Sequence, residues 1–299
     1  MLVVRRLSLF VLITLMVVPG WANVDPMPQG RPLSEKKPPA IEELTIVSAG
    51  KRMPGLLYMA NGPGPHPTLV LLHGFPGNEK NLDIAQAVRR SGFNVLFFHY
   101  RGAWGAEGSY RATRLNEDVA AVLAFLRHPD NASSLRVEPT RLSLLGHSLG
   151  GFTALAAGRN DDQLVCVGAM SPVNLALWKA GLTHKDANTQ RVLDYADSLF
   201  MLADFNGEVL REELQSTATA ELDTTGFAEG LRGKSVLLVT GGQDLVTPAK
   251  QMHTPVVESY AKESTITLHH HLISGDHSFS WSRIPLTALI IDWLSSDCR

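Results

Sequence analysis

The segment that most constrains this chain runs from Leu142 to Gly151 and has the sequence LSLLGHSLGG. Its first part, Leu142–Leu145, predicts a short buried strand, and the alanine-rich stretch Phe152–Ala157 predicts a helix. Between them Gly146–Gly150 makes a sharp turn that carries Ser148 at its centre. The small glycines let the chain pass close to itself, and the turn pushes the serine hydroxyl out of the sheet. Because the free N–H groups of the new helix point to the same place, this turn predicts a site that stabilises a negatively charged oxygen.

Around this turn the sequence alternates between strand and helix patterns. The predicted strands are Leu44–Val47, Leu56–Met59, Thr68–Leu72, Phe93–Phe98, Leu164–Ala169, Val236–Thr240 and Ile266–His270, and the predicted helices are Asn81–Arg90, Val119–Leu126, Ala249–Tyr260 and Leu286–Leu294. This alternation predicts an α/β fold, with a mostly parallel central sheet flanked by helices. Ligands bind at the carboxyl ends of such strands, so the loops that carry His73, Arg101, Asp244 and His277 should converge near Ser148.

The alternation of strand and helix patterns stops between residues 172 and 233, where no strand pattern occurs. Three helices are predicted there instead, at Leu175–Ala180, Val192–Leu202 and Glu208–Gln215. We interpret residues 172–233 as a helical insertion over the carboxyl edge of the sheet, which would act as a lid or as a pocket wall. The alternative is a structural excursion that lies away from the site.

The N-terminus and the composition indicate one large exported domain. The 299 residues are 44% hydrophobic and 19% charged, as in ordinary globular proteins. Two arginines precede the apolar run Leu7–Val18, and small residues follow it at the positions that a signal peptidase recognises. We therefore predict a signal peptide over residues 1–22, a proline-rich linker that acts as an extended tether over 23–40, and the folded domain over 41–299. The mature protein would be periplasmic or secreted without a stable membrane span, and the alternative is an uncleaved N-terminal anchor.

The chain contains two cysteines, Cys166 and Cys298. In an oxidising compartment they could pair. Cys166 lies in an apolar strand, however, where a buried free thiol is common. We therefore expect unpaired thiols, with a disulfide as the alternative.

The sequence gives no reason to expect nucleic acid, a metal ion or a cofactor. The formal net charge is −2, which provides no attraction to a polyanion. No phosphate-binding loop, dinucleotide-binding glycine motif or HExxH motif occurs. His269 and His271 share one face of a predicted strand, but without a nearby carboxylate or thiolate they make a poor metal site.

Two later loops supply the groups that a nucleophilic serine needs. A serine is a weak nucleophile at neutral pH and requires a base, which in turn requires an acceptor that orients it. Asp244 directly follows one predicted strand and His277 closely follows the last one. Asp223 and Asp276 also lie in predicted loops, so they remain open as alternative acids.

The chain order Ser148, Asp244, His277 resembles that of the α/β-hydrolase family. The segment His73–Gly77, HGFPG, resembles the oxyanion loop of that family, and Tyr100-Arg101-Gly102 is similar to a loop of its prolyl-oligopeptidase-like and dienelactone-hydrolase-like members. The resemblance covers residues 44–294 and implies an α/β-hydrolase fold with a helical lid-like insertion.

Carried over residue by residue, the resemblance implies that Ser148 is the nucleophile, His277 the general acid and base, and Asp244 the residue that holds the imidazole. The backbone N–H groups of Phe75 and Leu149 would form the oxyanion hole.

Two further residues, Trp104 and His147, are expected to contact the substrate. The function expected from this resemblance is hydrolysis of small carboxylic esters through an acyl-serine intermediate, without a cofactor. A serine peptidase of the prolyl-oligopeptidase-like kind, acting on short peptides, is the alternative enzyme, because the same residues serve both reactions. A non-catalytic binding protein on the same scaffold is the alternative of another class.

Overall fold

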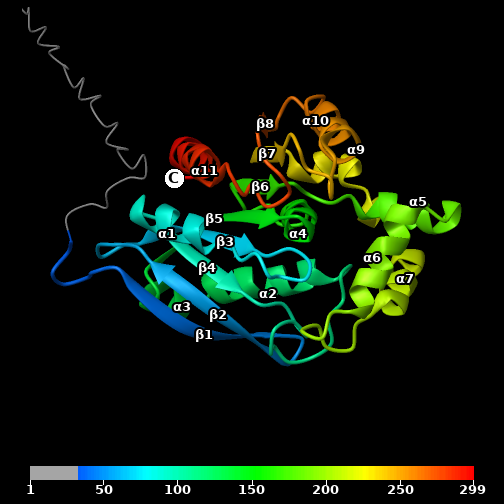
Figure 1. The fold of residues 1–299 in the computed structure, drawn as a ribbon. Helices are drawn as coiled ribbons and strands as arrows, with labels where there is room; N and C mark the ends of the chain where they lie inside the picture. The colour runs from blue at the N-terminus through cyan, green and yellow to red at the C-terminus, as the bar shows by residue number, and fades with distance from the viewer. Residues whose placement is uncertain (1–32) are drawn as a thin grey trace, which may run out of the picture.

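A single eight-stranded sheet forms the centre of the computed structural model, which describes residues 33–299 (Figure 1). Its strands are β1 (Ala40–Ser48), β2 (Lys51–Met59), β3 (His66–Leu72), β4 (Asn94–Phe98), β5 (Val137–His147), β6 (Cys166–Met170), β7 (Ser235–Gly241) and β8 (Thr267–Ile273). They lie in the order β1-β2-β4-β3-β5-β6-β7-β8. Strands β3 to β8 run parallel to one another, whereas β2 pairs antiparallel with both of its neighbours, β1 and β4. The predicted mostly parallel sheet is therefore confirmed.

Helices cover both faces of this sheet (Figure 1). One face carries α1 (Leu82–Arg90) and α11 (Arg283–Asp297), and the other carries α2 (Leu115–Arg127), α3 (Pro129–Ser134), α4 (Leu149–Gly158), α9 (Ala249–Met252) and α10 (Thr254–Tyr260). Successive strand residues feed opposite layers, as Leu144 packs with the α4 side and Leu145 with the α11 side. The continuous apolar runs of the sequence therefore mark strands that are buried on both faces.

The helical insertion lies between β6 and β7, at the right of Figure 1. It contains α5 (Leu175–His184), α6 (Ala187–Asp197), α7 (Gly207–Ser216), α8 (Thr219–Leu222) and the 3-10 helix η1 (Thr224–Leu231). The predicted helix Val192–Leu202 is wrong in its bounds, because the Asp186 side chain caps an earlier start by accepting the N–H of Thr189. Beyond Asp197 the chain leaves the helix and Leu202 forms a β-bridge with Ala103. This tertiary contact carries no local sequence signal.

The predicted signal peptide and most of the predicted linker lie outside the described residues. The end of the linker that is described docks on the domain: the N–H of Ser34 donates to the Asn61 side chain at 2.8 Å, and the carbonyl of Lys37 accepts the N–H of Gly62 at 2.8 Å. Strand β1 already begins at residue 40. The described end of the predicted linker therefore contacts the domain at residues 34 and 37, and the linker itself stays a prediction. Among the helices of residues 33–299, none is long and apolar enough to cross a membrane.

The two cysteines form a disulfide, which overturns the expectation of free thiols. The sulfur atoms of Cys166 and Cys298 are 2.04 Å apart, and both residues are buried. Cys166 is the first residue of β6, and Cys298 follows α11. Because α11 packs into the apolar layer that also contains β6, the end of the chain returns to this strand across 132 residues.

A buried carboxyl joins the insertion to the rest of the domain. Glu213, on α7, accepts the N–H of Thr113 at 3.3 Å and lies 3.6 Å from the guanidinium of Arg111. Its second oxygen, Oε1, has no hydrogen-bond partner in the described part of the chain. Burial raises the pKa of Glu213 to about 7 despite the hydrogen bond from Thr113 and the charge of Arg111.

This raised pKa predicts how stability depends on pH. Ionising Glu213 costs the folded state free energy, so wild-type stability should fall as the pH rises from the ordinary glutamate pKa toward the raised one. Glu213→Gln stays neutral and should be more stable than wild type at pH 8 by about 3 kcal/mol, with no difference at pH 4. Urea unfolding at pH 4, 6 and 8 measures the free energy of unfolding of the two proteins. The same pH dependence of this free energy in wild type and Glu213→Gln would contradict the prediction.

Candidate active site

Ser148 lies at a strained turn between β5 and α4. Its backbone has φ 58° and ψ −120°, a conformation that non-glycine residues rarely adopt. A Cβ atom added at Gly146 would lie 1.9 Å from the Gly150 carbonyl oxygen, and one added at Gly150 would lie 2.3 Å from that of Leu72. The two glycines are therefore required by close approach of the backbone. The N–H of Ser148 donates to the Met170 carbonyl at 2.9 Å, which fixes the turn to β6.

Asp244 and His277 meet at the carboxyl ends of β7 and β8. The imidazole Nδ1 of His277 donates to Oδ2 of Asp244 at 2.8 Å. The other carboxylate oxygen, Oδ1, accepts the N–H groups of Val246 and Thr247, both at 2.8 Å. Burial opposes ionisation of Asp244, but the hydrogen bonds and charge of His277 and the hydrogen bonds of Thr247 outweigh it and hold the pKa of the carboxyl below its ordinary value. Asp244 is therefore an ionised acceptor for the imidazole.

Thr247 is a member of this site that the sequence analysis missed. Its hydroxyl donates to Oδ2 of Asp244 at 2.6 Å and lies 3.3 Å from Nδ1 of His277. It comes three residues after the acid, a spacing at which a threonine can return a hydrogen bond to an aspartate in a turn. That spacing was the available signal. The hydroxyl and the two N–H groups together fix the orientation of the carboxylate.

His147 holds the loop of His277 next to the serine turn. Its Nε2 donates to the His277 carbonyl oxygen at 2.7 Å, and the two ring centroids are 4.8 Å apart. Burial lowers the pKa of His147 to about 3, so the ring is a neutral donor at physiological pH. Among the described residues, no hydrogen bond joins the Ser148 hydroxyl to the His277 ring. Such catalytic bonds often tighten only when substrate is bound.

The loop after β3 lies directly against the serine. A Cβ atom added at Gly74 would lie 3.5 Å from the Ser148 Oγ atom. Within the described residues, neither the N–H of Phe75 nor that of Leu149 donates a hydrogen bond to another protein group. Nδ1 of His73 donates to the Gly74 carbonyl at 2.8 Å and braces the loop. Two free N–H donors therefore flank the serine, as an oxyanion hole requires.

Trp104 supports this loop from the side. Its indole N–H donates to the Pro76 carbonyl oxygen at 2.8 Å, and the ammonium of Lys80 lies 5.3 Å from the ring centroid. The ring also stacks on His99 at 6.0 Å. These contacts give Trp104 a supporting position, as the bond to His277 does for His147. Substrate contact by either residue stays a prediction.

The insertion reaches the same loop. The ring of Phe75 meets that of Tyr195, on α6, edge to face at 5.9 Å, and that of Phe205 at 5.7 Å. Tyr195 is 45% exposed, so an aromatic surface remains open beside the loop. The insertion thus packs against the candidate site, and its role as a lid stays a prediction.

The other acids and histidines that the sequence left open have partners elsewhere. Asp223 accepts hydrogen bonds from Asn174 and Thr225. Asp276 accepts the N–H and hydroxyl of Ser280. His269 contacts Asp297 at 2.8 Å. In residues 33–299, no group of three or more histidine, cysteine, aspartate or glutamate side chains is arranged to hold a metal ion.

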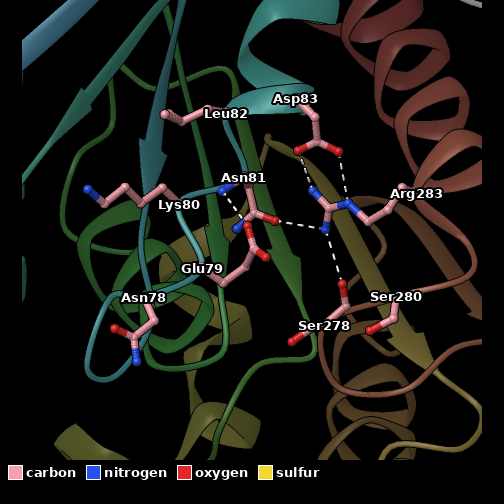
Figure 2. Close-up of a pocket in the computed structure, with 9 residues that line it drawn as sticks. All are labelled: Asn78, Glu79, Lys80, Asn81, Leu82, Asp83, Ser278, Ser280 and Arg283. Carbon is pink, nitrogen blue, oxygen red and sulfur yellow. Dashed lines mark hydrogen bonds and ion pairs between the residues drawn. The ribbon is translucent and has the colours of Figure 1, made fainter.

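Arg283 links the His277 loop to the segment that follows the oxyanion loop, a contact that no local pattern in the sequence indicates (Figure 2). Its guanidinium makes two hydrogen bonds to Asp83, at 2.9 and 2.5 Å, and one to the Asn81 side chain at 3.0 Å. It also donates to the Ser278 carbonyl oxygen at 3.1 Å. This bidentate pair therefore anchors the residue directly after His277 to the start of α1.

Comparison with known proteins identifies the class. The chain belongs to the alpha/beta hydrolase family, whose sequence pattern it matches over residues 69–288. The protein is therefore a hydrolase by family and fold, as the chain order of serine, acid and histidine predicted.

The individual proteins that match this chain do so only at low sequence identity or over part of their length. An Escherichia coli protein described as an uncharacterized 31.7 kDa protein in the traX-finO intergenic region is 24% identical, over 62% of this chain and 75% of its own length. Matches to other curated relatives cover as little as 30% of their length. Among solved structures, Pyrococcus furiosus esterase Pf2001 is similar with a TM-score of 0.65 and 16% identity, over 87% of this chain and 92% of the esterase. Est1E from Butyrivibrio proteoclasticus has a TM-score of 0.63 and 17% identity, over 85% and 97% respectively. These two likenesses show the fold.

Proposed function

We propose that the protein is an exported serine hydrolase that cleaves carboxylic esters through an acyl intermediate on Ser148. The observation that carries this proposal is the 2.8 Å hydrogen bond between His277 and the buried Asp244, in a loop that His147 ties to the strained serine turn. A base that is oriented by a carboxylate beside a serine on such a turn is the arrangement of nucleophilic acyl transfer.

Each group has one role in the proposed reaction. Nε2 of His277 takes the proton of the Ser148 hydroxyl as the oxygen attacks the ester carbonyl, and Asp244 stabilises the imidazolium. The N–H groups of Phe75 and Leu149 hold the tetrahedral oxyanion. His277 then gives the proton to the leaving alcohol, and the acyl group stays on the serine. A water molecule, deprotonated by the same imidazole, releases the acid and restores the enzyme.

The ester preference and the export rest on separate supports. The solved structure of Pyrococcus furiosus esterase Pf2001 has the same fold, which supports an ester substrate, and a Pyrococcus horikoshii acylaminoacyl peptidase also shares the fold, so the peptidase stays the alternative. The buried disulfide between Cys166 and Cys298 favours an oxidising compartment, in line with the predicted signal peptide.

A fluorophosphonate probe tests the nucleophile. Wild-type protein should be labelled, and Ser148→Ala should lose both the label and ester hydrolysis. Ser264→Ala, a change at an exposed serine outside the site, is the matched control and should keep both. A folded wild-type protein that takes no label would favour the binding-protein alternative, and a label that persists in Ser148→Ala would place the nucleophile elsewhere. Aryl esters compared with aminoacyl amides distinguish an esterase from a peptidase.

A further inference from the structure

A pocket of about 560 Å³ lies between the start of α1 and the segment that follows His277 in the chain (Figure 2). Two segments line it: residues 78–83, which follow the oxyanion loop, and the residues Ser278, Ser280 and Arg283, which follow His277. Its volume falls in the range of small-molecule sites, roughly 300–1,000 Å³. The ion pair between Arg283 and Asp83 spans the two segments and holds the lining in place.

The position of the pocket assigns it to one half of an ester. In the proposed reaction His277 gives its proton to the oxygen of the leaving alcohol, so that alcohol must lie on the histidine side of the scissile bond. The lining begins at Ser278, the residue directly after this histidine. This adjacency in the chain is the ground on which the pocket is assigned to the alcohol.

The lining combines polar side chains with apolar surface and is formally neutral. Arg283 and Lys80 are cationic, and Asp83 and Glu79 are anionic, so the charges cancel. An apolar alcohol would displace water from these groups without replacing the hydrogen bonds that the water makes, and this loss costs free energy. A charged alcohol would gain no net attraction. Neutral groups that both donate and accept hydrogen bonds fit this lining best.

Three polar side-chain groups of the pocket are not used by the protein itself. In the part of the chain that the structure describes, the exposed Asn78 amide and the half-buried Ser278 hydroxyl make no hydrogen bond to another protein group. The Nδ2 donor of Asn81 is also unpaired, although this side chain is only 1% exposed. Buried donors without a partner are rare in folded proteins and call for an explanation. The ion pair of Arg283 with Asp83 holds the two lining segments together, and the three unpaired groups remain available to form hydrogen bonds with a ligand.

We propose that this pocket binds the alcohol half of the substrate, and that this half is a neutral, hydroxyl-rich group of the size of glycerol or a single sugar unit. The assignment to the alcohol rests on the proposed ester hydrolysis, whereas the affinity for hydroxyl-rich groups rests on the pocket alone. Hydroxyl groups would donate to the carboxylate and amide oxygens and accept from the free amide and hydroxyl donors.

The test compares esters with one acyl group and different alcohols. For ethyl butyrate, monobutyryl glycerol and a butyryl glucose, kcat/KM is measured and normalised to the rate of alkaline hydrolysis. Wild type should prefer the polyol esters by about tenfold or more, and the preference should fall about tenfold in Asn78→Ala/Ser278→Ala, since each hydrogen bond is worth roughly 1 kcal/mol. The control Ser264→Ala should keep the preference. Equal values for all three esters, or a stronger preference for an ester of glycerol phosphate, would overturn the proposal.

A second measurement does not depend on turnover. Glycerol and glucose are titrated into Ser148→Ala and followed by NMR shifts, with the Asn78→Ala/Ser278→Ala changes added as the comparison. Saturable binding that the added changes weaken supports the pocket even if no ester is cleaved, in which case only the proposed function fails. Shifts that do not saturate, or that the changes leave as they were, overturn the pocket itself.

Discussion

Asp244→Asn is expected to lower kcat for ester hydrolysis by roughly 10⁴-fold while the protein keeps its fold. Oδ1 of Asp244 accepts two backbone N–H groups, so the amide oxygen of asparagine must take that position. The amide NH₂ then faces Nδ1 of His277 and donates to it. The imidazole is forced to carry its proton on Nε2, where it no longer accepts the proton of Ser148. Initial rates with an aryl ester, together with circular dichroism, measure the effect.

The matched controls are the two acids that the sequence left open. Asp223→Asn and Asp276→Asn remove carboxylates whose partners are Asn174, Thr225 and Ser280, and both should keep kcat within about threefold. If Asp276→Asn loses turnover and Asp244→Asn retains it, the acid of this site has been assigned to the wrong residue.

Reduction of the disulfide is expected to lower the free energy of unfolding by about 4–5 kcal/mol, because the crosslink closes a long loop in the unfolded chain. Cys166 and Cys298 are 132 residues apart. The loop between them contains Asp244 and His277, so the crosslink also restricts the unfolded chain that carries these groups. Guanidinium unfolding of oxidised protein, and of protein unfolded and refolded with reductant, measures the difference.

Two forms of the protein without the disulfide separate the stability contributed by the crosslink from the stability contributed by packing of the sulfur atoms. Reduced wild type keeps both sulfur atoms, whereas Cys166→Ala/Cys298→Ala also leaves small cavities, so the variant should be the less stable of the two. Oxidised and reduced proteins that unfold at the same denaturant concentration would refute the stabilising role of the crosslink.

The sequence predicted the fold class because the deciding signals are local. The apolar runs gave the strands and their alternation with helical patterns gave the parallel sheet, which the strand pairing confirms. Gly146 and Gly150 marked the turn because only glycine fits so close to the neighbouring backbone. Asp244 and His277 could be selected because each follows a strand, and parallel strands end at the same edge. The bond between them agrees with that selection.

The bounds of α6 and the packing of the insertion could not be predicted in the same way. The helix ends where the chain turns to pair with Ala103, which belongs to the loop after β4. The contact of Tyr195 with Phe75 joins α6 to the loop after β3, which is far away in the sequence. The hydrophobic periodicity of a stretch of about 10–20 residues predicts a local helix or strand, but it does not predict which distant residues that element will contact.

By itself, then, the sequence determined the layers of the fold, the turn of Ser148 and the two loops that carry the acid and the histidine. Only the tertiary structure decided that Cys166 pairs with Cys298, that His147 donates to the His277 loop, and that Arg283 joins this loop to the start of α1. The first set depends on hydrogen bonding and burial between near neighbours, which the local pattern encodes. The second depends on which distant backbone and side-chain atoms the packed helices bring within about 3 Å, and that distance exists only after the chain has folded.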